Sequence, residues 1–388
     1  MARLQRTTTV RLLALGLAAC AAPRSEPLPS PAEASKPAAE APLAAPPEAN
    51  VHGGAIADAG PGAPPRGAAA AAQVAADSVA TDPVAEVLAL PPSHSRSLGG
   101  PDSGQLQGAV ALPERGPGFI HNPRRPHDAR HGTVELVQAI VRAAAVVERE
   151  LPGSGLVVND LSLPEGGPIA QHGSHQNGRD ADILFYSVDT RGRPLPSVGV
   201  PIDPEGKGWD FKDLSTPVDD VRLSLDAPRT WRFMQALVEV AGEHLQRIFI
   251  VEHVRTMLLE QARRVRAPRA AVERFALVSC QPGTPHDDHM HLRFFCAPDD
   301  IAEGCLDKAP IYPWHKQALA AQGLEAVRET WKDRRARRAQ VAARTTTREQ
   351  ARQRAQRKWG KLHKRVRDFL ELRESWAKKT TPARPYCR

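Results

Sequence analysis

The chain has 388 residues, 25% of them charged, and a formal net charge of +8. This length allows one substantial hydrophobic core or two smaller ones. Residues 325–388 contain 21 Lys and Arg but only 7 Asp and Glu, a net charge of +14, so residues 1–324 carry about −6. A uniformly basic protein is therefore excluded.

The N-terminus predicts an exported protein. Arginines precede a short apolar run, Leu12–Ala19, which is too short to span a bilayer permanently. The run Leu17-Ala18-Ala19-Cys20 resembles a bacterial lipobox, in which Cys20 would be lipidated; the alternative is an ordinary signal peptide that contains a cysteine. Because Ala21 follows in place of an aspartate, we expect residues 1–20 to direct a periplasmic lipoprotein to the outer membrane.

Residues 21–115 are dominated by Ala, Pro, Gly and Ser and contain no aromatic residue. Such a segment buries too little apolar surface to offset its ordering entropy. We therefore expect a disordered spacer at 21–115 and a folded domain at 116–324.

The pattern within 116–324 mixes helices and strands without a repeating βαβ rhythm. This predicts an α+β fold, with a small antiparallel sheet flanked by helices. Residues 203–226 read as an irregular surface excursion. The expected helices are 134–150, 230–241, 254–265 and 268–278, and the expected strands are 156–158, 181–186, 247–251 and 289–295.

The basic segment 325–388 has a mostly helical pattern with few apolar positions. It is either a solvated basic helix or a helix attracted to a polyanion such as anionic lipid or a cell-wall polymer. Nucleic acid is not an expected partner of an exported protein. The sequence gives no oligomeric state.

Export places the remaining cysteines in an oxidising compartment, where disulfides form. None has the spacing of a zinc knuckle. Cys296 and Cys305 close a short loop and are the first expected pair. Cys280 and Cys387 remain as the second pair by elimination.

Histidines alternate along the strand expected at 289–295. Because successive side chains of a strand point to opposite faces, His289 and His291 share one face and Met290 and Leu292 the other, the core face. His286 precedes them on a loop. Asp287 and Asp288 either orient these histidines or belong to a solvated loop.

A second histidine loop precedes the strand expected at 181–186. Asp182 lies on the face opposite Ala181 and Ile183, and His175 stands seven positions earlier. Gly178 lies between them and can adopt backbone angles closed to other residues, so the loop can fold back and bring His175 beside Asp182.

Two imidazoles and one carboxylate suit a catalytic zinc ion, which keeps a fourth position open for water. We expect His175, Asp182 and His291 to be the Zn²⁺ ligands. His289 faces the same side without binding the metal. It would act as a general base, or stabilise the oxyanion as an imidazolium.

At these residues the chain resembles the penicillin-insensitive murein endopeptidases, which belong to a wider group of zinc peptidases with lysostaphin, the D-Ala-D-Ala dipeptidases and the Sonic hedgehog domain. The resemblance covers about 118–315. Its motifs are His172-x-x-His175-Gln176-x-Gly178-Arg179-Asp180-x-Asp182 and His286-Asp287-Asp288-His289-x-His291.

The resemblance implies a zinc endopeptidase that cuts D-alanyl to meso-diaminopimelyl cross-links of peptidoglycan. It implies the same three ligands and a catalytic His289, with His172 and His286 lining the site as partners of the ligands or binding additional metal. The rivals are a non-catalytic cell-wall-binding zinc lipoprotein and a carboxypeptidase or dipeptidase acting on the same polymer. Retention of His289 favours an enzyme, because a structural zinc site needs a fourth ligand instead of a free base.

Overall fold

The computed structural model describes residues 82–330 except 154, 170 and 171, together with 353, 357, 361–377 and 387. The expected signal peptide with Cys20, most of the expected spacer and much of the basic tail lie outside these residues. Within the described part of the chain, no helix combines the length and apolar character that crossing a membrane requires.

A seven-stranded sheet forms the centre of the domain, in the order β14-β13-β15-β8-β7-β5-β4. Its β13–β14 and β5–β7 pairs are parallel and its other pairs antiparallel. The expected small antiparallel sheet is thus corrected to a larger mixed sheet, because short strands at both edges extend it. The strands of this sheet are β4 Arg115–Gly116, β5 Phe119–His121, β7 Leu156–Val158, β8 Asp180–Leu184, β13 Leu245–Phe249, β14 Ser279–Cys280 and β15 His289–Phe294.

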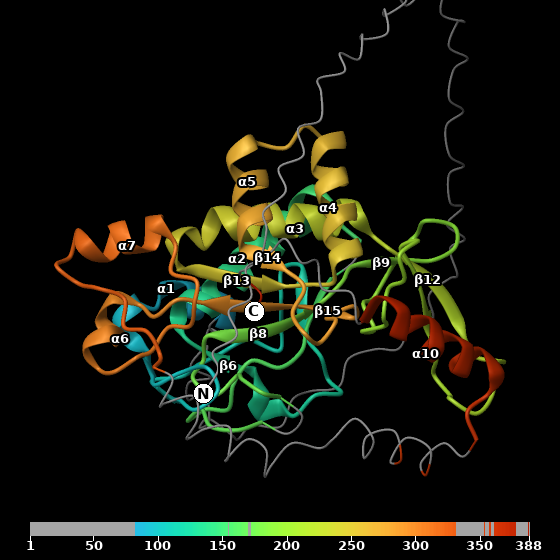
Figure 1. The fold of residues 1–388 in the computed structure, drawn as a ribbon, viewed down its shortest axis with the longest axis horizontal. Coiled ribbons are helices and arrows are strands. Elements are labelled where there is room, and N and C mark those ends of the chain that lie inside the picture. The colour runs from blue at the N-terminus through green and yellow to red at the C-terminus, as the bar shows by residue number, and fades with distance from the viewer. Residues whose placement is uncertain are drawn as a thin grey trace, which may run out of the picture. The chain divides into compact units, whose positions relative to one another are not determined.

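Helices cover the central sheet. In α2 the apolar residues recur at helical spacing and are buried, and in α3 Asp226 caps the first turn by accepting a hydrogen bond from the Arg229 amide at 3.1 Å. Figure 1 shows α3, α4 and α5 together on one side of the sheet. The helices are α1 Pro83–Ala89, α2 Val134–Glu150, α3 Ala227–Val240, α4 Glu252–Arg264, α5 Arg269–Val278, α6 Pro298–Ala302, α7 Pro313–Ala320 and α10 Lys364–Ala377, with 3₁₀ turns η1 Pro92–His94, η2 His127–Arg130 and η3 Gly242–His244.

Residues 82–115 are structured, so the expected boundary of the spacer at 115 is wrong. This segment forms α1, η1, β1 (Arg96–Leu98), β2 (Gln105–Gln107) and β3 (Val110–Ala111). The pieces are short: α1 buries Val84 and Val87, β2 buries Leu106, and η1 buries no side chain. The average composition of an Ala- and Pro-rich segment does not reveal single buried side chains of this kind.

The expected irregular excursion at 203–226 also contains strands. β11 (Lys207–Asp210) and β12 (Val221–Leu225) pair with each other, and β12 pairs with β9 (Ser187–Val188). With β10 (Pro194–Leu195) they form a four-stranded sheet. β6 (His131–Gly132) pairs with β3.

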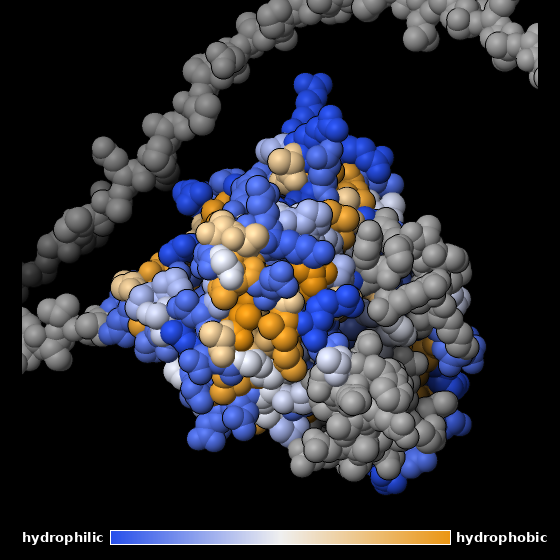
Figure 2. Space-filling model, turned by 60° about the vertical axis from the view of Figure 1, so that its left-hand side comes forward, coloured by the Kyte–Doolittle hydropathy of each residue, from blue (hydrophilic) through white to orange (hydrophobic). Residues whose placement is uncertain are grey.

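Both expected disulfides are present, Cys296–Cys305 and Cys280–Cys387. The described part of the basic tail is not a solvated helix, because Val366, Phe369 and Trp376 of α10 are buried. Some large apolar side chains of the domain remain exposed to solvent. Figure 2 shows a group of apolar residues surrounded by hydrophilic ones on one face of the domain.

Candidate metal centre

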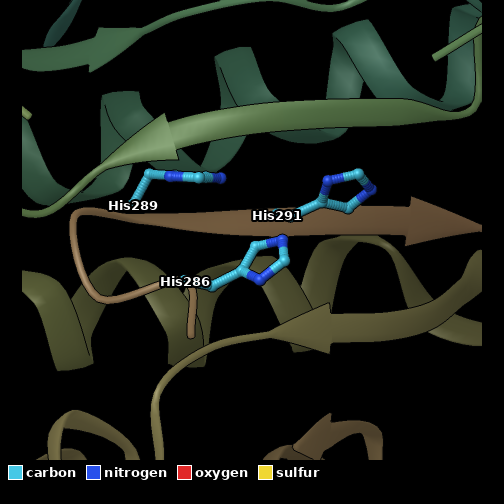
Figure 3. A group of neighbouring side chains, drawn as sticks. All are labelled: His286, His289 and His291. Atoms are coloured by element: carbon cyan, nitrogen blue, oxygen red, sulfur yellow. The ribbon is translucent and has the colours of Figure 1, made fainter. Parts of the chain in front are cut away.

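The pairing of β8 with β15 brings several residues of the site together. In this antiparallel pair His291 stands opposite Asp182, and Arg293 stands opposite Asp180. Met290 and Leu292 are fully buried on the other face, as the alternation predicts. Figure 3 shows His289 and His291 on β15 and His286 on the loop that leads into it.

The loop before β8 turns back and brings His175 beside Asp182. The backbone of His175 adopts a φ of 70° and that of Gly178 a φ of 78°, both in the left-handed region. The ring Nδ1 of His175 lies 2.8 Å from the Leu161 carbonyl oxygen, which can only accept a hydrogen bond. Nδ1 therefore donates this hydrogen bond, which turns Nε2 toward Asp182.

The side chains of His175 and His291 converge on Oδ1 of Asp182. His175 Nε2 lies 3.3 Å and His291 Nδ1 lies 3.1 Å from this oxygen, and the rings of His175 and His291 have centroids 4.6 Å apart. Oδ1 of Asp182 and Nε2 of His175 are buried and have no hydrogen-bond partner among the described residues. Buried polar atoms without partners are costly, so this arrangement fits a bound cation.

Two groups of possible metal ligands adjoin at this point. The first contains His172, His175 and Asp182, and the second His286, His289 and His291, with the ligand atoms of each group within 4.8 Å of one another. The three expected ligands come from both groups, and Asp182 lies between them. The structure thus brings together all six residues that the sequence singled out.

His289 is held between two carboxylates. Its Nδ1 lies 2.6 Å from Oδ1 of Asp288, and its Nε2 lies 3.4 Å from Oδ1 of Asp182. Burial disfavours the imidazolium, but these two carboxylates raise the pKa of His289 well above its usual value. Asp288 thus orients His289, one of the two alternatives predicted for it.

His172 and His286 lie beside the expected ligands, but the closest contacts of their ring nitrogens are with other groups. His172 Nε2 contacts Asp160 at 2.7 Å, and its Nδ1 lies 3.5 Å from Asp182. His286 Nδ1 lies 3.0 Å from the Thr284 carbonyl oxygen. Burial, together with the neighbouring His289 and His291, lowers the pKa of His286 to about 3, so its ring is neutral.

Charged side chains next to the expected ligands contact the carboxylates of Asp180 and Asp182. Arg293 donates two hydrogen bonds to Asp180, at 2.7 and 2.9 Å, and His291 Nε2 lies 3.5 Å from the same carboxylate. Burial opposes ionisation of Asp182, but His289 and His175 lower the pKa of its carboxyl well below its usual value. Burial likewise opposes ionisation of Asp180, but Arg293 and His291 lower the pKa of its carboxyl well below its usual value, so both aspartates are ionised at neutral pH.

Sequence reasoning did not assign a role to the pair of Asp160 and Arg125. Asp160 is 1% exposed, and Arg125 donates to it through Nε at 2.9 Å and through Nη2. The pair lies beside His172, with Arg125 Nη2 3.5 Å from its Nε2. A single aspartate after a strand carries no spacing signal that could have marked this pair.

Comparison with known proteins decides the family of this site. The family model of the penicillin-insensitive murein endopeptidases matches residues 97–357, which is more than half of the chain. The chain belongs to this family. The predicted resemblance is thereby confirmed, and the murein endopeptidase match contains every candidate site residue from His172 to His291.

Curated murein endopeptidases are similar over the same region. A penicillin-insensitive murein endopeptidase of Klebsiella pneumoniae subsp. pneumoniae is 27% identical over 247 residues, which cover 61% of this chain and 79% of that protein. The proteins of the same name from Citrobacter koseri and Pectobacterium atrosepticum are 26% and 27% identical, over 62% and 53% of this chain and 80% and 66% of their own lengths.

Proposed function

We propose that this chain is a zinc-dependent murein endopeptidase that hydrolyses the peptide cross-links of peptidoglycan. The observation that carries the proposal is the convergence of His175 and His291 on one buried oxygen of Asp182, with His289 oriented beside them. Membership of the murein endopeptidase family and the names of the curated relatives support the substrate.

His175, Asp182 and His291 would hold the metal. Two imidazole nitrogens and a carboxylate oxygen are typical ligands of catalytic zinc, and Nδ1 of His175 already donates to a carbonyl oxygen, which orients its other nitrogen. Zinc bound there would make water a stronger nucleophile at neutral pH and polarise the scissile carbonyl group.

His289 would handle the proton. With Nδ1 beside Asp288, its Nε2 is directed to the same side as Asp182. The ring would accept a proton at Nε2 from the attacking water or, as imidazolium, donate a hydrogen bond to the developing oxyanion. A purely structural site has no use for such an oriented extra imidazole.

We propose D-alanyl to meso-diaminopimelyl bonds as the substrate. A metal-assisted attack by water needs no serine nucleophile, so penicillin has no residue to acylate and should leave the activity intact. His172 and His286 would line the site, where they can orient a ligand or contact the substrate.

Digestion of purified sacculi followed by mass spectrometry of the soluble muropeptides tests the proposal. We expect cross-linked dimers to decline and monomers to rise, with the same yield in the presence of penicillin. Stem peptides that shorten while dimers persist would instead identify a carboxypeptidase. Binding to sacculi with no product released would identify a non-catalytic cell-wall-binding protein.

We further propose that the chain is exported and anchored to the outer membrane through a lipid on Cys20. The two disulfides support an oxidising compartment such as the periplasm. Membrane fractionation of the wild type and of Cys20→Ser tests this. We expect the wild type in the outer-membrane fraction and the variant in the soluble fraction. A variant that fractionates like the wild type would contradict the anchor.

A further inference from the structure

Helix α10 belongs to the folded domain although the family match ends before it. The family match ends at residue 357, and α10 begins at Lys364. Phe369 and Trp376 join the main hydrophobic core, and Val366 is also buried. The helix is therefore packed into the folded domain.

Among the described residues, every side-chain hydrogen bond to Asp287 comes from α10. Arg373 donates to its two oxygens, from Nε at 2.8 Å and from Nη2 at 2.6 Å, and Trp376 donates from Nε1 at 2.8 Å. Asp287 is 0% exposed. Charge-assisted bidentate pairs of this kind are among the stronger hydrogen bonds in proteins.

Asp287 lies in the middle of the segment that carries the site histidines. Its carbonyl oxygen accepts a hydrogen bond from the Ile202 amide at 2.7 Å, and the His286 carbonyl oxygen accepts one from the Val251 amide at 3.0 Å. His286 adopts a φ of 49°, which is unusual for a residue other than glycine. Surrounding contacts must therefore hold this backbone in place.

The C-terminal end of α10 is itself anchored next to the site. The Trp376 carbonyl oxygen accepts a hydrogen bond from Gln281 at 3.3 Å, and the Trp376 ring contacts the His253 ring edge-on with centroids 5.7 Å apart. The Cys280–Cys387 disulfide attaches the chain beyond the helix to β14.

We propose that Arg373 and Trp376 are positioning residues that act through Asp287 to fix the segment 286–289, and hence the catalytic orientation of His289. Neither residue contacts the expected zinc ligands, so their role is separate from metal binding. This inference rests on the proposed function for its kinetic consequence. The fixation of the segment can be measured without any activity.

Two variants remove the contacts selectively in the full-length protein. Arg373→Met deletes the guanidinium with little change in length, and Trp376→Phe deletes the N–H donor while retaining an aromatic ring. Arg373→Lys keeps the charge but loses the bidentate geometry. Lys364→Met is the control, because Lys364 forms an exposed ion pair with Asp368 on the same helix.

The kinetic assay uses a purified soluble cross-linked muropeptide dimer. We expect Arg373→Met and Trp376→Phe to lower kcat by about 10–100-fold, as for other groups that orient active-site residues. KM should stay within about twofold and zinc should remain bound, because the ligands are untouched. Arg373→Lys should recover part of the lost kcat, and Lys364→Met should match the wild type.

Hydrogen exchange provides the readout that does not depend on activity. The amides of Ile202 and Val251 donate to the segment 286–289, so their exchange reports whether it is held in place. We expect exchange at both amides to accelerate at least about tenfold in Arg373→Met. We expect no change at these amides in Lys364→Met.

Unchanged kcat and unchanged exchange in both Arg373→Met and Trp376→Phe would overturn the inference. If Arg373→Met does not fold, Trp376→Phe and Arg373→Lys decide by the same criteria. If the wild type fails to cleave the dimer, the proposed function fails. Exchange at Ile202 and Val251 then still decides whether α10 fixes the segment: acceleration supports it and no change overturns it.

Discussion

His175 and His291 meet edge-on, with ring centroids 4.6 Å apart and an angle of 75° between the rings. One comes from the loop before β8 and the other from β15, directly opposite Asp182 in the strand register. A one-residue slip of that register would turn His291 away from Asp182. The candidate metal centre therefore depends on the register of the β8–β15 pairing.

Asp182→Asn tests the ligand assignment. The substitution conserves size but removes the charge and one strong ligand oxygen at the point where His175 and His291 converge. Zinc affinity should fall by more than the roughly 10–100-fold typical of losing a partner of a ligand. Competition with a chromophoric chelator measures this, with exposed Asp128→Asn as the control. Equal affinities would show that Asp182 is not a ligand.

Zinc should stabilise the folded chain, because the ligands are assembled only in the native state. At a free zinc concentration of about 100 times Kd the gain is roughly 2.7 kcal/mol. This corresponds to a rise in Tm on the order of 5–10 °C. Calorimetry with and without zinc tests it, and Asp182→Asn should show little shift. A wild-type Tm that does not respond to zinc would contradict the assignment.

Asp300 should make stability depend on pH. Burial raises the pKa of its carboxyl to about 6, whereas an unfolded aspartate titrates near about 3.9. The folded chain thus holds a proton that the unfolded chain releases between these values, so this contribution is complete below about pH 4 and is lost as pH rises through about 6.

Asp300→Asn removes that titration. Relative to the wild type, the variant should gain about 2–3 kcal/mol of unfolding free energy between pH 4 and pH 7. Urea unfolding of both proteins at the two pH values measures the difference. A constant difference at both values would mean that the folded Asp300 titrates normally.

Arg179 should be essential for stability. It is 1% exposed and donates to Asp307 at 2.9 Å, and to the Phe294 and Leu306 carbonyl oxygens. Arg179→Met leaves the buried Asp307 charge without its main partner, which should cost about 3–5 kcal/mol. The exposed Arg193 pairs with Asp189, and Arg193→Met should cost at most about 1 kcal/mol in the same urea assay. Similar losses in both variants would contradict this argument.

Local apolar patterns predicted the elements whose buried residues are contiguous or regularly spaced in the sequence. The helix over 134–150 and the strand over 156–158 were predicted at their observed bounds, because their apolar residues are contiguous or regularly spaced. The strands between 96 and 116 have two or three residues each and were missed. Their order comes from pairing with distant segments, which a local pattern does not contain.

The site, like the fold, was predicted from the sequence only in part. Alternation along β15 placed His289 and His291 on one face, and Gly178 marked the turn before β8. The left-handed backbone of His175 and the contact of Arg373 with Asp287 gave no local signal. Both arise from tertiary packing, and the charge-rich sequence around Arg373 obscures the few apolar residues that dock α10.

The most direct test of the proposed catalytic site compares the wild type with His289→Ala on a purified muropeptide dimer cross-linked through a D-alanyl to meso-diaminopimelyl bond. Both proteins are loaded with zinc, and exposed His94→Ala is the control. We expect the wild type and the control to convert dimer to monomers, and His289→Ala to be slower by about 10²–10⁴-fold while binding the same amount of zinc. Equal rates for His289→Ala and the wild type, or no cleavage by the zinc-loaded wild type, would contradict it.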